Sequence, residues 1–117
     1  MTRSARNSLR QETQLDVVFN ALSDSTRRKM LSSLMRGSKT VTELAEPFDI
    51  SLPAISKHLK VLESARLVER TIEGRVHHCR ISAKPLEDAE KWLSHYRTFW
   101  EGNLDALKEY IEKSDKE

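Results

Sequence analysis

The chain contains one cysteine in 117 residues, Cys79. A single thiol cannot form an intramolecular disulfide, and it cannot supply the two or four thiolates of the common zinc sites. No apolar run approaches the roughly 20 residues that a membrane helix needs. The first residues also lack the apolar core of a secretory signal. We therefore expect a cytoplasmic protein with no membrane segment, no disulfide and no cofactor.

The excess of positive over negative charge is small: the net charge is only +2 and the sequence pI is about 8.8. Both values fall short of those typical of strongly basic nucleic-acid-binding domains. The distribution of charge is more informative than its sum. Lys and Arg outnumber Asp and Glu through residue 80, whereas residues 84–117 are rich in acids. The N-terminal and C-terminal parts of the chain are therefore expected to have different functions.

The length allows one domain with its own core. Residues 1–12 are polar and show no sustained period, so we interpret them as a flexible basic arm. Residues 13–113 are expected to form the domain, and residues 114–117 a tail. The first helix is predicted by apolar residues at i, i+3, i+4 and i+7, which are Leu15, Val18, Phe19 and Leu22. The second helix is predicted to run from residues 23–25 to about Arg36, with Met30, Leu31, Leu34 and Met35 inward.

Two further helices are predicted between residues 40 and 65. The first, from Glu43 to about Phe48, is opened by Thr40 or Thr42 and kept short by Pro47. After a tight turn, Ser51 can cap the next helix, and Pro53 falls in its first turn. Its inward face is predicted to consist of Leu52, Ile55, Leu59 and Leu62. Its outward face is predicted to carry Ser56, Lys57, Lys60 and Ser64.

The hydrophobic period then changes from 3.6 toward 2. Residues 67–72 and 75–81 are predicted to form a β-hairpin that turns at Glu73 and Gly74. A long final helix is predicted from Pro85 to Glu112, with Leu86, Ala89, Leu93, Tyr96, Trp100, Leu107 and Tyr110 near a heptad seam. Most of the aromatic residues lie in this helix. Their area exceeds what a small monomer can cover, so a partner subunit is expected. The expected fold class is mainly α with a small β-hairpin wing.

A short helix, a tight turn and a second helix with a polar outer face are typical of a helix-turn-helix, whose second helix enters the major groove of DNA. Ser51 and Ser56 can reach base edges or phosphates, and Lys57 and Lys60 can neutralise phosphates. Pro53 allows close approach of the backbone. A solvated amphipathic helix would show the same pattern, so the alternative of a simple surface helix stays open.

The hairpin adds Arg75 and Arg70, which can lie along the DNA backbone or in the minor groove. His58, on the flank of the predicted recognition helix, can touch phosphate or pack against the domain. A solvated basic turn is the alternative reading of the hairpin tip.

Two runs of the sequence resemble the ArsR/SmtB family of winged helix-turn-helix repressors: LSDSTRRKMLSSL, and TVTELAEPFDISLPAISKHLKVLESARLVERTIEGRVHHCRI. The resemblance covers roughly residues 14–112. It implies a homodimer joined by the first and last helices, on an inverted-repeat operator and often with autorepression. It further implies that residues 51–60 form the recognition helix and that Arg75 lies in the wing. The residues assigned to the dimer interface are Leu15, Phe19, Leu93, Tyr96, Trp100 and Leu107.

The sequence departs from the metal sensors of that family. Their third helix carries paired cysteines, but residues 42–47 here contain none, and His95 stands alone in the last helix. The segments TELAEPFDISLPAISKHLK and WLSHYRTFWEGNLDAL are closer to a metal-independent subgroup. His77, His78 and Cys79 do not suggest a metal site either, because alternation along a strand points His78 away from the other two. We therefore expect no metal, and the effector is unknown.

The residues also bear on three other functions. A thiol enzyme built on Cys79 and His78 is disfavoured, because adjacent strand residues diverge and no phosphate loop or nucleophile elbow is present. A protein-interaction module that uses the aromatic last helix would leave Ser56, Lys57 and Arg75 without a common purpose. A metal-responsive sensor with an atypical site is the remaining alternative. The sequence thus predicts a DNA-binding regulator that is not an enzyme.

Overall fold

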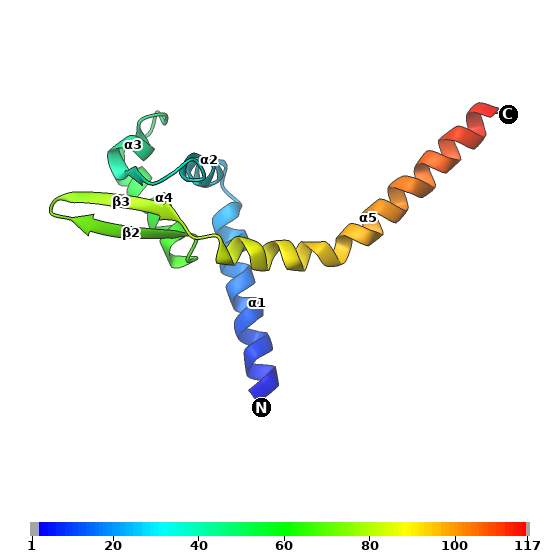
Figure 1. The fold of residues 1–117 in the computed structure, drawn as a ribbon, viewed down its shortest axis with the longest axis horizontal. Coiled ribbons are helices and arrows are strands. Elements are labelled where there is room, and N and C mark those ends of the chain that lie inside the picture. Colours follow the sequence, from blue (N-terminus) through cyan, green and yellow to red (C-terminus); the bar gives the residue numbers. More distant parts are fainter. Residues whose placement is uncertain (1–2, 117) are drawn as a thin grey trace.

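The computed structural model describes residues 3–116, in which five helices and three strands form a winged helix-turn-helix (Figure 1). The elements are α1 (Arg3–Leu22), α2 (Ser25–Leu34), β1 (Lys39–Thr40), α3 (Val41–Ala45), α4 (Leu52–Ser64), β2 (Val68–Glu73), β3 (Val76–Ile81) and α5 (Lys84–Lys116). The predicted fold class, mainly α with a β-hairpin wing, is confirmed. No helix in residues 3–116 has both the length and the apolar character of a membrane span.

One hydrophobic core is built from residues of the four helices α1, α2, α3 and α4, the base of the wing and the start of α5. Its largest fully buried side chains are Met30, Leu34, Leu44, Ile55, Leu59, Leu62, Leu67, Val18 and Cys79. No polar or charged residue is buried among the described residues. The expected inward position of Met35 is wrong, because α2 ends at Leu34 and Met35 is its exposed C-cap.

Side-chain caps fix where α2 and α3 begin. Asp24 accepts a hydrogen bond from the Arg27 backbone N–H at 3.0 Å, which starts α2. Thr40 and Glu43 form a reciprocal capping box at the start of α3, each bonding the backbone N–H of the other at 3.1 Å. This box places α3 at Val41–Ala45, earlier than the predicted 43–48. Phe48 lies beyond the helix but packs half-buried against the core.

The wing is a three-stranded antiparallel sheet of order β1-β3-β2. The pairing of Glu73 with Val76 leaves Gly74 and Arg75 as the turn, one residue later than predicted. Gly74 has a φ of +63°, a conformation that glycine adopts without strain. Sequence reasoning missed β1, whose two residues pair with Cys79 and His78 of β3 and tie the start of α3 to the wing. Two residues are too few to show a period.

The two terminal helices are longer than predicted. Helix α1 begins at Arg3, so most of the expected flexible arm is helical; good helix-forming residues such as Arg and Gln extend it without an amphipathic stripe. Helix α5 continues through Lys116 and includes most of the expected tail. Residues 1–2 of the arm and residue 117 of the tail lie outside the described residues. Figure 1 shows the start of α1 and the second half of α5 projecting from the domain.

Candidate nucleic-acid interface

The recognition helix α4 has one buried and one exposed face, as its position in a helix-turn-helix requires. Ile55, Leu59 and Leu62 are fully buried against the core. The expected contact residues of the exposed face are all open to solvent: Ser51, Pro53, Ser56, Lys57 and Lys60. Helices α1 and α2 and strand β2 pack against α4. All five residues are therefore accessible to solvent, and their contact with DNA stays a prediction.

The first turn of α4 differs from the prediction in one respect. Ser51 is the N-cap, and its Oγ accepts a hydrogen bond from the Ala54 N–H at 3.3 Å. Leu52 was expected to face inward, but its side chain is 60% exposed. The first fully buried residue of α4 is Ile55, one turn further on, because no other element covers the helix start.

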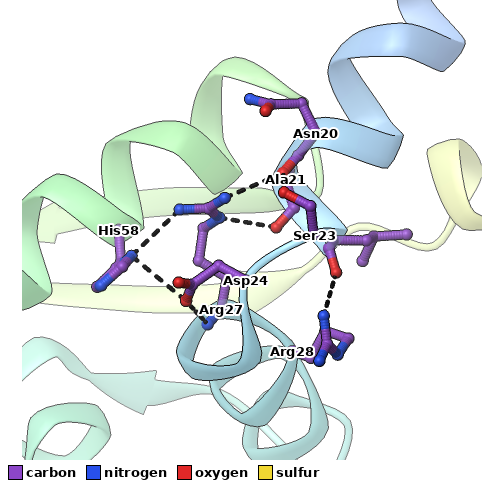
Figure 2. A network of polar contacts seen from close by, with 8 residues as sticks. Asn20, Ala21, Ser23, Asp24, Arg27, Arg28 and His58 are labelled. Atoms are coloured by element: carbon purple, nitrogen blue, oxygen red, sulfur yellow. Dashed lines mark hydrogen bonds and ion pairs between the residues drawn. The ribbon is translucent and has the colours of Figure 1, made fainter.

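His58 lies on the flank of α4 that faces α2, as Figure 2 shows. Its Nδ1 is 3.3 Å from an Arg27 Nη and 3.8 Å from an Asp24 carboxylate oxygen. The side chain is only 24% exposed. These contacts support the interpretation that His58 packs against the domain. A contact between His58 and DNA stays a prediction.

Arg27 is the centre of the network in Figure 2, and sequence reasoning missed it. Its guanidinium donates to the Ala21 carbonyl at 2.7 Å and the Asn20 carbonyl at 3.0 Å, both near the end of α1. The hydrogen bond from the backbone N–H of Arg27 lowers the pKa of the Asp24 carboxyl. The charges of the nearby His58 and Arg27 side chains lower this pKa further. One side chain thus contacts residues of α1 and α4 from its position in α2.

Two of the wing's arginines, Arg75 and Arg70, were predicted to contact DNA, and they differ in their surroundings. Arg75 is exposed at the turn, where a backbone phosphate can approach it. Arg70 instead forms an ion pair with Glu63 of α4, with its Nε 3.1 Å from the carboxylate, and also lies 3.1 Å from His77 Nδ1. To contact DNA as expected, the Arg70 guanidinium would have to leave its ion pair with Glu63. This pair connects the wing to the recognition helix.

His77, His78 and Cys79 do not converge on one point, as alternation along the strand predicts. His77 contacts Arg70, whereas His78 lies 3.7 Å from a Glu73 carboxylate oxygen on the other face of the sheet. Cys79 is fully buried, and burial raises the pKa of its thiol. Within residues 3–116, no three His, Cys, Asp or Glu side chains are grouped so that they could hold a metal ion.

The residues assigned to the dimer interface fall into two groups. Leu15 and Phe19 are half-buried and pack against the core, and the Phe19 ring lies 5.6 Å from the Trp92 ring of α5 in an edge-on arrangement. The α5 residues are exposed: Leu93, Tyr96, Trp100 and Leu107. Nothing in the described chain covers this apolar side of α5.

A winged helix-turn-helix whose second helix shows serines and lysines to solvent defines a DNA-binding transcriptional regulator. Known proteins agree with this class. The model of the family described as "Bacterial regulatory protein, arsR family" matches residues 24–70. The transcriptional repressor SdpR of Bacillus subtilis (strain 168) is 37% identical over 79 residues, which cover 68% of this chain and 88% of that protein. The arsenical resistance operon repressor of Staphylococcus aureus is 32% identical over 75 residues, or 64% of this chain and 72% of the other.

Solved structures extend the match to most of the fold. The crystal structure of an ArsR family transcriptional regulator has a TM-score of 0.72 and 42% identity, covering 77% of this chain and 93% of the other. An ArsR-like regulator from Rhodococcus sp. RHA1 has a TM-score of 0.66 and 34% identity, covering 84% and 92%. The chain therefore belongs to the arsR family of bacterial regulatory proteins. This family consists of transcriptional regulators, not enzymes.

Proposed function

We propose that this protein is a repressor that binds an inverted-repeat operator as a homodimer, with α4 in the major groove. The observation that carries the proposal is the two-sided character of α4. Its buried side is fixed to the core by Ile55, Leu59 and Leu62, and its exposed side offers Ser56, Lys57 and Lys60. Phosphate contacts by lysines position such a helix, and short hydroxyl side chains can read base edges.

The homodimer is supported by the apolar surface of α5. Its large apolar residues between Trp92 and Ile111 are 41–70% exposed. An exposed apolar row of this length marks an interface, and a second copy of the chain carries the same row. The half-buried Phe19 and Leu15 extend this surface onto α1. A dimer also provides the two recognition helices that an inverted repeat requires.

The proposed dimer belongs to a metal-independent subgroup and works in the cytoplasm beside its DNA. The absence of paired cysteines in residues 42–47 and the divergence of His77 and His78 support metal independence. The buried, protonated state of the Cys79 thiol disfavours reaction with oxidants, because the thiolate is the reactive form.

Zinc and mild peroxide are expected to leave operator affinity unchanged. The physical reason is that residues 3–116 contain no ligand cluster for zinc and that Cys79 is shielded from peroxide. The measurement is fluorescence anisotropy of the protein–operator complex during titration with each reagent. A typical allosteric effector changes affinity by about 5- to 150-fold. Release of that size at stoichiometric zinc contradicts metal independence.

Ser56→Ala and Lys60→Ala are expected to weaken binding in different ways. Loss of a base contact by Ser56 costs roughly 1 kcal/mol per half-site, or roughly thirtyfold for the dimer, on the operator alone. Lys60→Ala removes a phosphate contact, so it weakens operator and scrambled duplexes alike. It also flattens the dependence of log affinity on log salt by roughly one per lost contact. Anisotropy titrations of both duplexes at several salt concentrations measure these effects.

Arg75→Ala serves as the matched wing variant and is expected to behave like Lys60→Ala. The operator for these titrations comes from selection of bound sequences out of random duplexes. If Ser56→Ala shifts operator and scrambled DNA equally, Ser56 does not read sequence. If the wild-type protein selects no sequence at all, the aromatic α5 surface and a protein-interaction role become the better account.

A further inference from the structure

An apolar side chain at the start of the recognition helix is largely exposed. Leu52 is the first residue of α4 and is 60% exposed, and Ile50 just before it is 42% exposed. Leu52 shares the helical stripe of Ile55 and Leu59, yet it lies beyond the end of the core. A leucine that leaves most of its surface exposed contributes little to the stability of the free domain.

The residues on either side of Leu52 differ in what they can offer to DNA. The Ser51 hydroxyl accepts the capping hydrogen bond from the Ala54 N–H, and Pro53 has no backbone N–H to donate. Ser56, four residues after Leu52, is its neighbour along the helix surface. The Ser51 O–H can still donate a hydrogen bond. Leu52 and Pro53 are both exposed, so the first turn of α4 presents two apolar side chains, and the next exposed hydroxyl, that of Ser56, comes one turn later.

The major groove offers a single kind of apolar group at the base edges, the C5-methyl of thymine. The N-terminal residues of a recognition helix are those that reach base edges. We propose that Leu52 is a specificity-determining residue, which selects thymine in each half-site by packing its side chain against the thymine C5-methyl. This inference rests on the proposed insertion of α4 into the major groove. Ser56 reads a neighbouring base pair in the same half-site.

The test replaces each operator thymine by uracil, one symmetrical pair at a time. Uracil lacks only the methyl group and keeps every hydrogen bond of the base pair. One methyl group buried in an apolar contact is worth about fourfold in affinity per half-site. For the wild-type protein, one thymine position per half-site is expected to show this loss on replacement. Leu52→Ala is expected to bind the thymine and uracil operators with equal affinity.

Two further variants separate this contact from its surroundings. Lys60→Ala is expected to weaken binding to the thymine and uracil operators by the same factor, because a phosphate contact does not depend on the methyl group. Ile50→Ala shows whether the neighbouring apolar residue contributes to the same discrimination. Circular dichroism melting is expected to be unchanged for Leu52→Ala, because its side chain is largely exposed.

The outcomes distinguish the inference from the function on which it rests. If Leu52→Ala still discriminates thymine from uracil as the wild type does, Leu52 does not read the methyl group. If no thymine position responds to uracil, the inference is also wrong, while sequence-specific binding of the operator still stands. Failure of the wild-type protein to prefer its operator over scrambled DNA overturns the proposed function itself.

Discussion

Trp100→Glu is expected to convert the homodimer into monomers and to weaken operator binding by about a hundredfold or more. Trp100 is 63% exposed on the apolar side of α5, beside Phe99, whose ring centre lies 6.4 Å away. Two-fold symmetry places two glutamates in one interface, where each must lose its hydration. Separated subunits also lose the gain in affinity from binding two half-sites together.

Light scattering at micromolar concentration measures the first effect, and operator anisotropy measures the second. The wild type is expected to show twice the chain mass of 13.5 kDa. Thr98→Glu is the matched control, since it adds the same charge at an exposed position about 200° around the helix from Trp100. A wild-type monomer that binds its operator tightly contradicts the proposed dimer. Equal effects of the two glutamates would place the interface elsewhere.

Arg27→Ala is expected to lower the free energy of unfolding by about 2 kcal/mol and the melting temperature by roughly 10 °C. The change removes the guanidinium bonds to the Ala21 and Asn20 carbonyls and the contact with His58 (Figure 2). The α1 carbonyls then lose a charged donor, and α4 loses its link to α2. Operator affinity is expected to fall as well, because the recognition helix is less rigidly held.

Arg28→Ala is the control for this prediction. Arg28 is exposed and donates one hydrogen bond, to the Leu22 carbonyl at 2.6 Å. Its replacement is expected to change stability by no more than about 0.5 kcal/mol. Thermal melts of both variants at one protein concentration give the comparison, because dimerisation makes the melting temperature depend on concentration. Equal melting temperatures would show that Arg27 does not join the helices.

In the recognition helix, the sequence pattern predicted the cap and the buried residues correctly but placed one residue wrongly. Ser51 as cap, Pro53 in the first turn and the buried triad of Ile55, Leu59 and Leu62 follow from local rules, and the structure has all of them. The same periodicity placed Leu52 in the core. A helical period gives the direction of a side chain but not whether another element lies there to cover it.

The ends of the chain show a different limit. Amphipathic periodicity marks only the parts of a helix that pack on something, so it gave α1 too late a start and α5 too early an end. The first turns of α1 and the last turns of α5 have no core to face within one chain. Their helical form follows from residue propensity, which is a weaker signal than a buried stripe.

By itself the sequence determined the order of the five helices and the hairpin, the cap of α4 and the family, because these depend on neighbours within a few residues. Only the tertiary structure decided which polar residues are free for DNA. It engages Arg70 with Glu63 and His58 with Arg27, and it leaves Ser56, Lys60 and Arg75 open. Ion pairs and hydrogen bonds between separate elements depend on distances of a few ångströms in space, and no local period records them.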